Sequence, residues 1–165
     1  MSPISLGSIR AIAFDFDGVF TDDRVLVSQT GDESVFCSRS DGLGINMLHE
    51  AEVRMIVISK ETNPVVSARA KKLSLEVVQG CDNKLPALKS WLARVSLTGH
   101  QCAYMGNDIN DLECMQFVGL SVAPQDAHPR VLQIAKIVTA RGGGRGAIRE
   151  FADLILQQIS DSANE

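Results

Sequence analysis

The sequence predicts an α/β protein with a doubly wound, Rossmann-like parallel sheet that helices cover on both faces. Two observations predict this fold: apolar runs of strand length recur along the chain, and segments with helical periodicity separate them. The expected strands are residues 9–14, 54–58, 76–78, 102–105, 120–122 and 137–138. The expected helices are residues 43–51, 65–73, 85–95, 112–117, 131–135 and 147–159.

Local signals mark two helix starts and one departure from this alternation. Asn63 is expected to cap a helix whose first residue is Pro64, and Asp41 is expected to cap the helix over residues 43–51. A β-hairpin inserted after the first strand is predicted by two short strand-like runs, residues 25–28 and 34–37, on either side of a turn-rich segment. The hairpin is too short to form a cap domain, so none is expected.

Length and composition favour one compact domain. The 165 residues are 45% hydrophobic and 22% charged, so we expect a single domain over residues 1–165 with loose ends at 1–8 and 160–165. A net charge of −4 and scattered basic residues argue against a nucleic-acid partner. Since the chain has neither an apolar run of the roughly 20 residues that span a membrane nor signal-peptide features, we expect a cytoplasmic protein with reduced cysteines and no membrane partner.

The strongest chemical signal follows the first predicted strand directly. Asp15 and Asp17 stand where ligands bind in an open parallel sheet, beyond the carboxyl end of a strand. Gly18 permits the sharp turn that would aim both carboxylates at one site, and such a pair suits Mg²⁺. From these two residues alone, a solvated pair of acids at a turn is the alternative.

The order of four motifs makes the signal specific. Residues 15–21, Asp-Phe-Asp-Gly-Val-Phe-Thr, resemble the first motif of the haloacid dehalogenase superfamily. The other motifs of that superfamily follow in the right order: Ser59 at the end of a strand, Lys84 at a helix start, and the acidic loop of residues 106–111, Gly-Asn-Asp-Ile-Asn-Asp. Taken alone, Ser59 is a common type of turn residue and Lys84 a common type of surface residue.

This resemblance implies a magnesium-dependent phosphatase with an aspartyl-phosphate intermediate. Asp15 would be the nucleophile, and Asp17 would protonate the leaving alcohol and then activate water. Ser59 would bond a phosphoryl oxygen, while Lys84 would neutralise charge on the nucleophile and on the phosphoryl group. An acid at position 17 favours a phosphatase over the pumps and dehalogenases of the superfamily.

The resemblance also implies a set of metal ligands. These are Asp15, Asp17, Asn107 and Asp108, with Asp111 in an outer position that adds negative charge. The chain departs from the commoner form of the acidic loop at Asn107, where many relatives carry an aspartate. An asparagine oxygen can still bind Mg²⁺, but it brings no charge, so we expect a lower affinity for the metal.

The resemblance narrows to a capless group of phosphatases. That group contains 3-deoxy-D-manno-octulosonate 8-phosphate phosphatase, the nonulosonate 9-phosphate phosphatases and the C-terminal domain of some acylneuraminate cytidylyltransferases. It implies a homotetramer in which the hairpins meet at the centre and a neighbour closes each site, with a phosphorylated keto sugar acid as substrate. Glu61, Arg69 and Lys72 match substrate-pocket positions of the nonulosonate 9-phosphate phosphatases, and the two cations would suit a substrate carboxylate.

Three points stay open at the level of the sequence. Arg69 and Lys72 also fit the solvated face of a helix. The glycine-rich stretch 142–146 fits either a flexible linker or a mobile segment that places Arg145 near a substrate. Because Asn107 weakens the metal motif, a noncatalytic oligomerisation domain of an acylneuraminate cytidylyltransferase is the alternative to a phosphatase.

Overall fold

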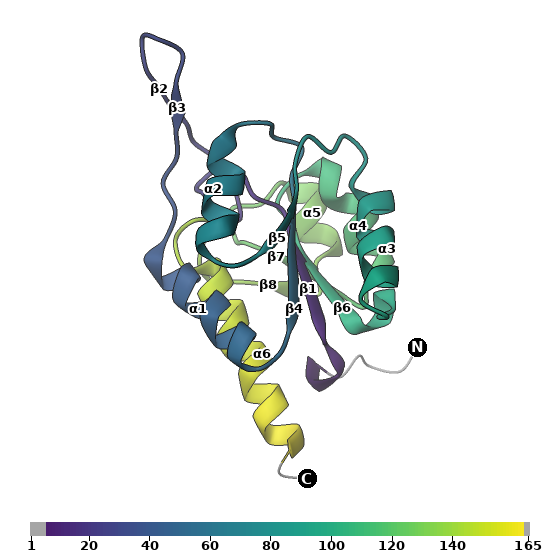
Figure 1. Ribbon diagram of the computed structural model, residues 1–165. Coiled ribbons are helices and arrows are strands. Elements are labelled where there is room, and N and C mark those ends of the chain that lie inside the picture. The colour runs from purple at the N-terminus through teal and green to yellow at the C-terminus, as the bar shows by residue number, and fades with distance from the viewer. Residues whose placement is uncertain (1–5, 164–165) are drawn as a thin grey trace.

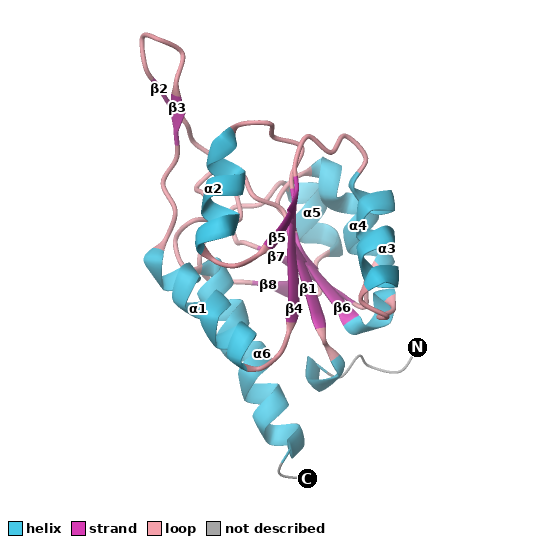
Figure 2. Ribbon diagram, viewed as in Figure 1, coloured by secondary structure: helices cyan, strands magenta, loops and turns pink. Residues whose placement is uncertain are grey.

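The computed structural model describes residues 6–163 and confirms the α/β prediction. Its main sheet has six strands, all parallel, and Figures 1 and 2 show the sheet between two layers of helices. In spatial order the strands are β5 (Glu76–Val78), β4 (Arg54–Ile58), β1 (Ala11–Phe14), β6 (Cys102–Met105), β7 (Leu120–Ala123) and β8 (Ile137–Val138).

The helices divide between the two faces of this sheet. The helices on one face are α1 (Arg39–Glu50), α2 (Pro64–Lys72) and α6 (Ala147–Ala163). The helices on the other face are α3 (Lys84–Arg94), α4 (Leu112–Phe117) and α5 (Pro129–Ile134). Short 3-10 helices occupy Leu6–Ser8, Gly99–Gln101 and Ile109–Asp111.

Strand β1 lies at the centre because its side chains serve both hydrophobic cores. Ile12 and Phe14 belong to the core under α1 and α6, whereas Ala11 and Ala13 belong to the core under α3. All four are fully buried, and a buried isoleucine or phenylalanine contributes about 1.5–3 kcal/mol. The chain therefore leaves the sheet at Asp15 from a fully buried strand.

The start of α1 differs from the prediction. Ser38, not Asp41, caps this helix: the Ser38 hydroxyl accepts hydrogen bonds from the N–H groups of Ser40 and Asp41. Asp41 is buried and instead accepts hydrogen bonds from the N–H groups of Gly146 (3.3 Å) and Arg149 (2.9 Å), at the start of α6. The expectation that Asp41 caps α1 was wrong. Its carboxylate accepts hydrogen bonds from residues more than a hundred positions away, and local sequence does not show such a contact.

The structure describes part of each end of the chain that was expected to be loose. Leu6 packs against the hydrophobic core, and the 3-10 helix that contains it contacts α6. Residues 160–163 continue α6. Residues 1–5 and 164–165 of the expected loose ends lie outside the described residues.

The predicted hairpin follows the first strand and extends from the body of the molecule. Its strands β2 (Leu26–Val27) and β3 (Glu33–Ser34) pair antiparallel and are exposed on both faces. Figure 1 shows it projecting from the end of the molecule at which β1 and β4 finish. No cap domain accompanies it within residues 6–163.

Two smaller expectations concern membranes and cysteines. In the described part of the chain, no helix has both the length and the hydropathy that a membrane span needs. All four cysteines are free; Cys102 and Cys114 are buried, while Cys37 and Cys81 are partly exposed.

We predict that Asp41→Ala lowers the free energy of unfolding by about 1–3 kcal/mol, because two backbone donors at the start of α6 would lose their acceptor. Chemical denaturation would measure the loss. Glu50→Ala, at an exposed position of α1, the helix that also contains Asp41, is the control and should change stability by less than about 0.5 kcal/mol. Equal stability of the two variants would contradict the role given to Asp41.

Candidate active site

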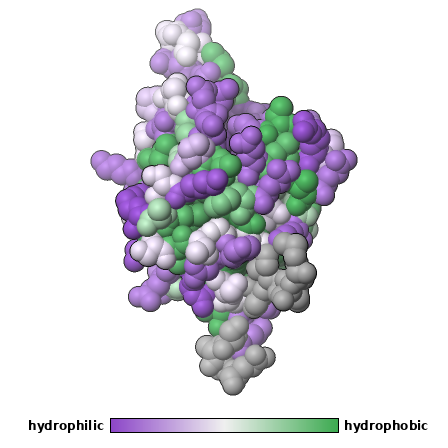
Figure 3. Space-filling view, turned by 90° about the vertical axis from the view of Figure 1, so that its right-hand side faces the viewer, coloured by the Kyte–Doolittle hydropathy of each residue, from purple (hydrophilic) through white to green (hydrophobic). Residues whose placement is uncertain are grey.

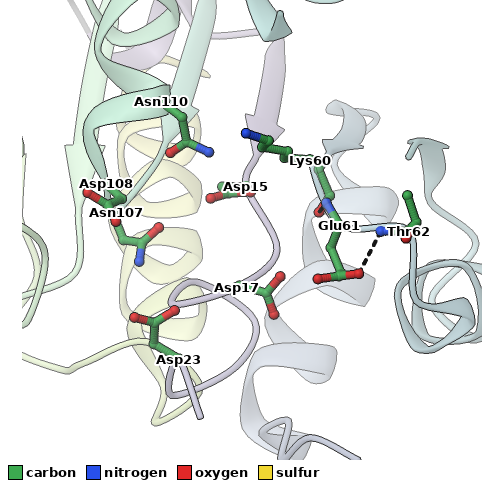
Figure 4. Close-up of a pocket in the computed structure, with 10 residues that line it drawn as sticks. Asp15, Asp17, Asp23, Lys60, Glu61, Thr62, Asn107, Asp108 and Asn110 are labelled. Carbon is green, nitrogen blue, oxygen red and sulfur yellow. Dashed lines mark hydrogen bonds between the residues drawn. The ribbon is translucent and has the colours of Figure 1, made fainter. Parts of the chain in front are cut away.

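A cavity of about 410 Å³ opens where strands β1, β4 and β6 end. Figure 4 shows its walls, which three loops supply. The lining residues are Asp15, Asp17 and Asp23 after β1, Ser59, Lys60, Glu61 and Thr62 after β4, and Asn107, Asp108 and Asn110 after β6. This is the crevice at which open parallel sheets bind ligands.

Asp15 is fixed at the floor of the cavity. Its N–H donates to the carbonyl of Met105 over 2.9 Å, which continues the pairing of β1 with β6. Its carboxylate Oδ1 accepts hydrogen bonds from the N–H of Phe16 (2.7 Å) and from the ammonium of Lys84 (2.7 Å). Only 5% of the residue is exposed, so the carboxylate has one orientation toward the cavity.

Gly18 provides the turn that brings Asp17 back to the same cavity. Its φ of +75° lies in the left-handed region, as predicted from the need for a sharp exit from the strand. The glycine is required for space as well, since an added Cβ would lie 1.9 Å from Nδ2 of Asn107. The backbone at Gly18 therefore packs directly against the Asn107 side chain.

Behind the cavity floor, Lys84 and Asp111 join three elements. The Lys84 ammonium donates to Asp15 and, over 2.8 Å, to Oδ1 of Asp111. The Tyr104 hydroxyl, in β6, donates to the same Oδ1 over 2.8 Å. Oδ2 of Asp111 accepts hydrogen bonds from the N–H groups of Asn107 and Asp108. This network ties the acidic loop to β1 and to the start of α3.

The electrostatics of the site follow from this burial. Burial raises the pKa of Asp15 above its ordinary value, and neighbouring Asp111 raises it further, while Lys84 opposes the shift. Burial acts to lower the pKa of Lys84, but the two carboxylates outweigh it and raise that pKa. Burial, followed by the charges of Glu61 and Asp23, raises the pKa of Asp17 to about 6. Asp17 thus has the pKa of a group that exchanges protons near neutrality.

The oxygen atoms of the cavity fit Mg²⁺. Oδ1 of Asn107 is buried and has no hydrogen-bond partner among the described residues, so it is available as a ligand. Asp15, Asp17 and Asp108 line the same cavity. Carboxylate and amide oxygens of this kind suit Mg²⁺, which usually binds one or two carboxylates and keeps waters and substrate oxygens as its other ligands.

The structure brings most of the expected site residues together. Ser59 and Glu61 join Asp15, Asp17, Asn107 and Asp108 in the wall of the cavity, and Lys84 and Asp111 lie behind its floor. Arg69 and Lys72 line a separate cavity of about 430 Å³ beside Cys37, and Arg69 donates to the carbonyl of Ser38. Arg145 is exposed and lies 3.6 Å from Asp22. These three cations do not line the cavity of their own chain.

The glycine-rich stretch is packed, so its interpretation as a flexible linker was wrong. The Gly144 N–H donates to the carbonyl of Val19 over 2.9 Å, and an added Cβ at Gly143 would lie 1.9 Å from the carbonyl oxygen of Gly18. A run of glycines is found both in flexible linkers and where two backbones approach closely, so composition alone does not distinguish the two cases. Here the glycines allow that approach, and they fix the turn that carries Asp17.

Sequence reasoning missed several residues of the site. Lys60, Thr62, Asp23 and Asn110 line the cavity. Two of them could have been found from their positions in the sequence, because Lys60 follows Ser59 directly and Asn110 belongs to the acidic loop. The contact of Tyr104 with Asp111 had no such signal, because Tyr104 reads as an ordinary strand residue.

The sequence is similar to known proteins of one hydrolase family. Residues 48–147 match the model of the haloacid dehalogenase-like hydrolases. The 3-deoxy-D-manno-octulosonate 8-phosphate phosphatase of Escherichia coli K12 is 35% identical over 150 residues, which cover 90% of this chain and 80% of the relative. The corresponding phosphatase of Yersinia pestis is 38% identical over the same coverage.

Solved structures give the same result. The phosphatase structure from Yersinia pestis has a TM-score of 0.93 at 35% identity, covering 96% of this chain and 88% of that one. A HAD family hydrolase from Streptomyces avermitilis has a TM-score of 0.90 at 46% identity, covering 92% and 87%. The Moraxella catarrhalis phosphatase, in complex with magnesium, phosphate and 3-deoxy-D-manno-octulosonate (KDO), has a TM-score of 0.91 at 27% identity, covering 97% and 92%.

We predict that Lys84→Met lowers the free energy of unfolding by about 3–5 kcal/mol at neutral pH, because it leaves two buried carboxylates without their shared cation. Chemical denaturation would measure the loss. Lys89→Met is the matched control on the same helix, since Lys89 is exposed and only rests over the Phe117 ring. The control should cost at most about 1 kcal/mol; an equal cost for both variants would remove the buried network as the reason.

Proposed function

The chain belongs to the haloacid dehalogenase-like hydrolases and is a phosphatase of that type, and we propose that it hydrolyses phosphorylated keto sugar acids through a phosphoryl intermediate on Asp15. One observation carries the proposal: Asp15 lies at the floor of an acidic cavity with a lysine bonded to its carboxylate from behind. The remaining residues of the cavity have chemistry that fits the same reaction.

Asp15 is the proposed nucleophile. Its carboxylate oxygen forms a bond to phosphorus while the bond between phosphorus and the ester oxygen breaks. Lys84 holds the other side of the carboxylate through its 2.7 Å contact, so the nucleophile is oriented before substrate arrives. The Ser59 hydroxyl, in the wall of the cavity, bonds a phosphoryl oxygen.

Asp17 is the proposed acid and base. With a pKa of about 6, it carries a proton in part of the molecules near neutrality and gives that proton to the leaving alcohol. The ionised carboxylate then accepts a proton from water as the water oxygen attacks phosphorus. This second step releases inorganic phosphate and restores the Asp15 carboxylate.

Mg²⁺ is the proposed cofactor. When bound to oxygens of Asp15, Asp17, Asn107 and Asp108, it would supply positive charge beside the phosphoryl oxygens. Support comes from the unpartnered Oδ1 of Asn107 and from the magnesium in the related Moraxella catarrhalis structure. Asp111 holds the acidic loop by accepting from the backbone of Asn107 and Asp108.

The substrate class is proposed from the relatives. Their names state 3-deoxy-D-manno-octulosonate 8-phosphate as substrate, and one is in complex with phosphate and KDO. Substrates of the nonulosonate 9-phosphate type belong to the same class of anionic keto sugar acid esters. A noncatalytic oligomerisation domain is the competing proposal. Asp15, Lys84 and Asp111 are buried together, and burying charged groups has a desolvation cost. A noncatalytic domain offers no reason for that cost.

A homotetramer is the proposed assembly. Large apolar side chains on and beside the hairpin are exposed, with Phe36 at 72% and Leu26 at 65%, and Figure 3 shows hydrophobic atoms on this projection at the top of the view. Apolar surface of this kind favours burial against another molecule. Arg69 and Lys72 line a cavity other than the one that holds Asp15, so we propose that they serve the substrate of a neighbouring copy, and that Arg145 reaches a substrate only in the assembly.

We predict that Asp15→Asn abolishes hydrolysis of a generic aryl phosphate and of keto sugar acid phosphates while the fold is kept. The variant should also differ in the pH dependence of metal-free stability. Since the folded-state pKa of Asp15 lies above its ordinary value of 3.8, the folded wild type holds an extra proton, and its free energy of unfolding falls as pH rises from about 4. Asp15→Asn lacks this slope, which thermal melts at several pH values would measure.

A panel of phosphorylated sugar acids, compared by kcat/KM, tests the substrate class. Glu61→Gln should change the ranking within the panel more than it changes hydrolysis of the aryl phosphate. Hydrolysis by Asp15→Asn at the wild-type rate would remove the nucleophile. A wild type that hydrolyses aryl phosphate but no sugar acid phosphate would remove the substrate class alone.

We predict that Leu26→Asp dissociates the assembly, because a charge replaces an apolar side chain where the copies would meet. Light scattering after gel filtration would measure the mass. Leu154→Asp, at an exposed leucine of α6, is the matched control and should leave the mass unchanged. A monomeric wild type would contradict the proposed assembly.

A further inference from the structure

Lys60 is the cation of the cavity wall. Among the described residues that line the cavity, Lys60 is the only lysine or arginine, whereas five of the others are acids: Asp15, Asp17, Asp23, Glu61 and Asp108. Lys84 lies behind the floor, already bonded to two carboxylates. A phosphate monoester brings about two more negative charges into this wall. Apart from a bound metal, Lys60 is the group that can meet them.

The orientation of Lys60 favours the phosphoryl end of the substrate. Lys60 follows Ser59 at the end of β4, and Figure 4 shows its ammonium end reaching over Asp15 toward Asn110. The Glu61 carboxylate turns to the other side, where it accepts hydrogen bonds from the N–H groups of Thr62 and Asn63. The lysine therefore points to the part of the cavity where phosphorus must approach the nucleophile.

Asp82 holds Lys60 only weakly. The two side chains lie 3.6 Å apart, beyond ordinary hydrogen-bond distance, and their exposed fractions are 64% for Lys60 and 89% for Asp82. Exposed ion pairs of this kind contribute little, because water screens both charges. Asp82 belongs to the loop after β5 and does not line the cavity. The ammonium can thus leave Asp82 at a small cost.

We propose that Lys60 binds the phosphoryl group of the substrate and that Asp82 holds its ammonium at the rim while the site is empty. On binding, the ammonium exchanges the Asp82 carboxylate for a phosphoryl oxygen. The long flexible stem and three donors of lysine suit such a movement. The inference rests on the proposed function in one respect: both require the substrate phosphorus to lie next to Asp15.

Binding of inorganic phosphate in the presence of Mg²⁺ tests the proposal by calorimetry. Lys60→Ala should weaken phosphate binding about tenfold, the effect expected for a lost charge-assisted hydrogen bond. Lys60→Arg should keep most of the affinity. Asp82→Asn should tighten binding about twofold, since the competing carboxylate is gone. Lys71→Ala, at an exposed position of α2, is the control and should bind phosphate as the wild type does.

The double variant separates the two roles. In the Lys60→Ala background, Asp82→Asn should have no effect, because the carboxylate then has no ammonium to hold. In turnover of an aryl phosphate, Lys60→Ala should raise KM about tenfold and leave kcat within about threefold, as loss of uniform binding does.

Three results would overturn the inference. They are wild-type phosphate affinity in Lys60→Ala, an Asp82→Asn effect that persists without Lys60, and a Lys60→Ala variant that loses affinity for a free keto sugar acid but not for phosphate. The last would assign Lys60 to the substrate carboxylate. Failure of the proposed substrate class is a separate result, because it would show in the sugar acid panel and leave phosphate binding unchanged.

Discussion

One ammonium group between two buried carboxylates is the interaction on which the site depends. Lys84 bonds Asp15 and Asp111, and all three residues are at most 5% exposed. When both acids are ionised, two carboxylates and one ammonium leave an excess negative charge in a region of low dielectric, and such charge is costly unless a proton or a cation compensates it. A divalent cation in the cavity is the natural compensation. The floor of the site is thus built to gain stability when a metal ion binds.

Glycine packing carries this rigidity from the floor to the proposed acid. The turn at Gly18 lies against Asn107 on one side and Gly143 on the other, and neither contact leaves room for a Cβ. The segment that includes Gly143 is held in turn by Asp41, through its acceptor bond to Gly146 at the start of α6. Asp41 lies in α1 and does not line the cavity, yet it supports the turn that positions Asp17.

The sequence predicted whatever depends on local pattern. Strands β4, β5, β6 and β8 were predicted to the residue, because each contains a short apolar run that is visible in the local sequence. Asp41 was assigned to the wrong helix, since its partner Arg149 is distant in sequence. The position of Arg69 away from its own cavity was equally hidden, because a residue type shows charge but not the direction in which a helix face points.

The two lysines of the site have different tasks, and these explain why Lys84 is buried and Lys60 is exposed. Lys84 is fixed by two carboxylates, so it acts on charge at Asp15 throughout the reaction and can favour the transition state. Lys60 sits at an exposed rim beside a competing carboxylate, so its contact with phosphate is weaker and reversible. Inorganic phosphate must leave before the next turnover, and a second buried cation would retain it. An exposed lysine that can return to Asp82 attracts the substrate without trapping the product.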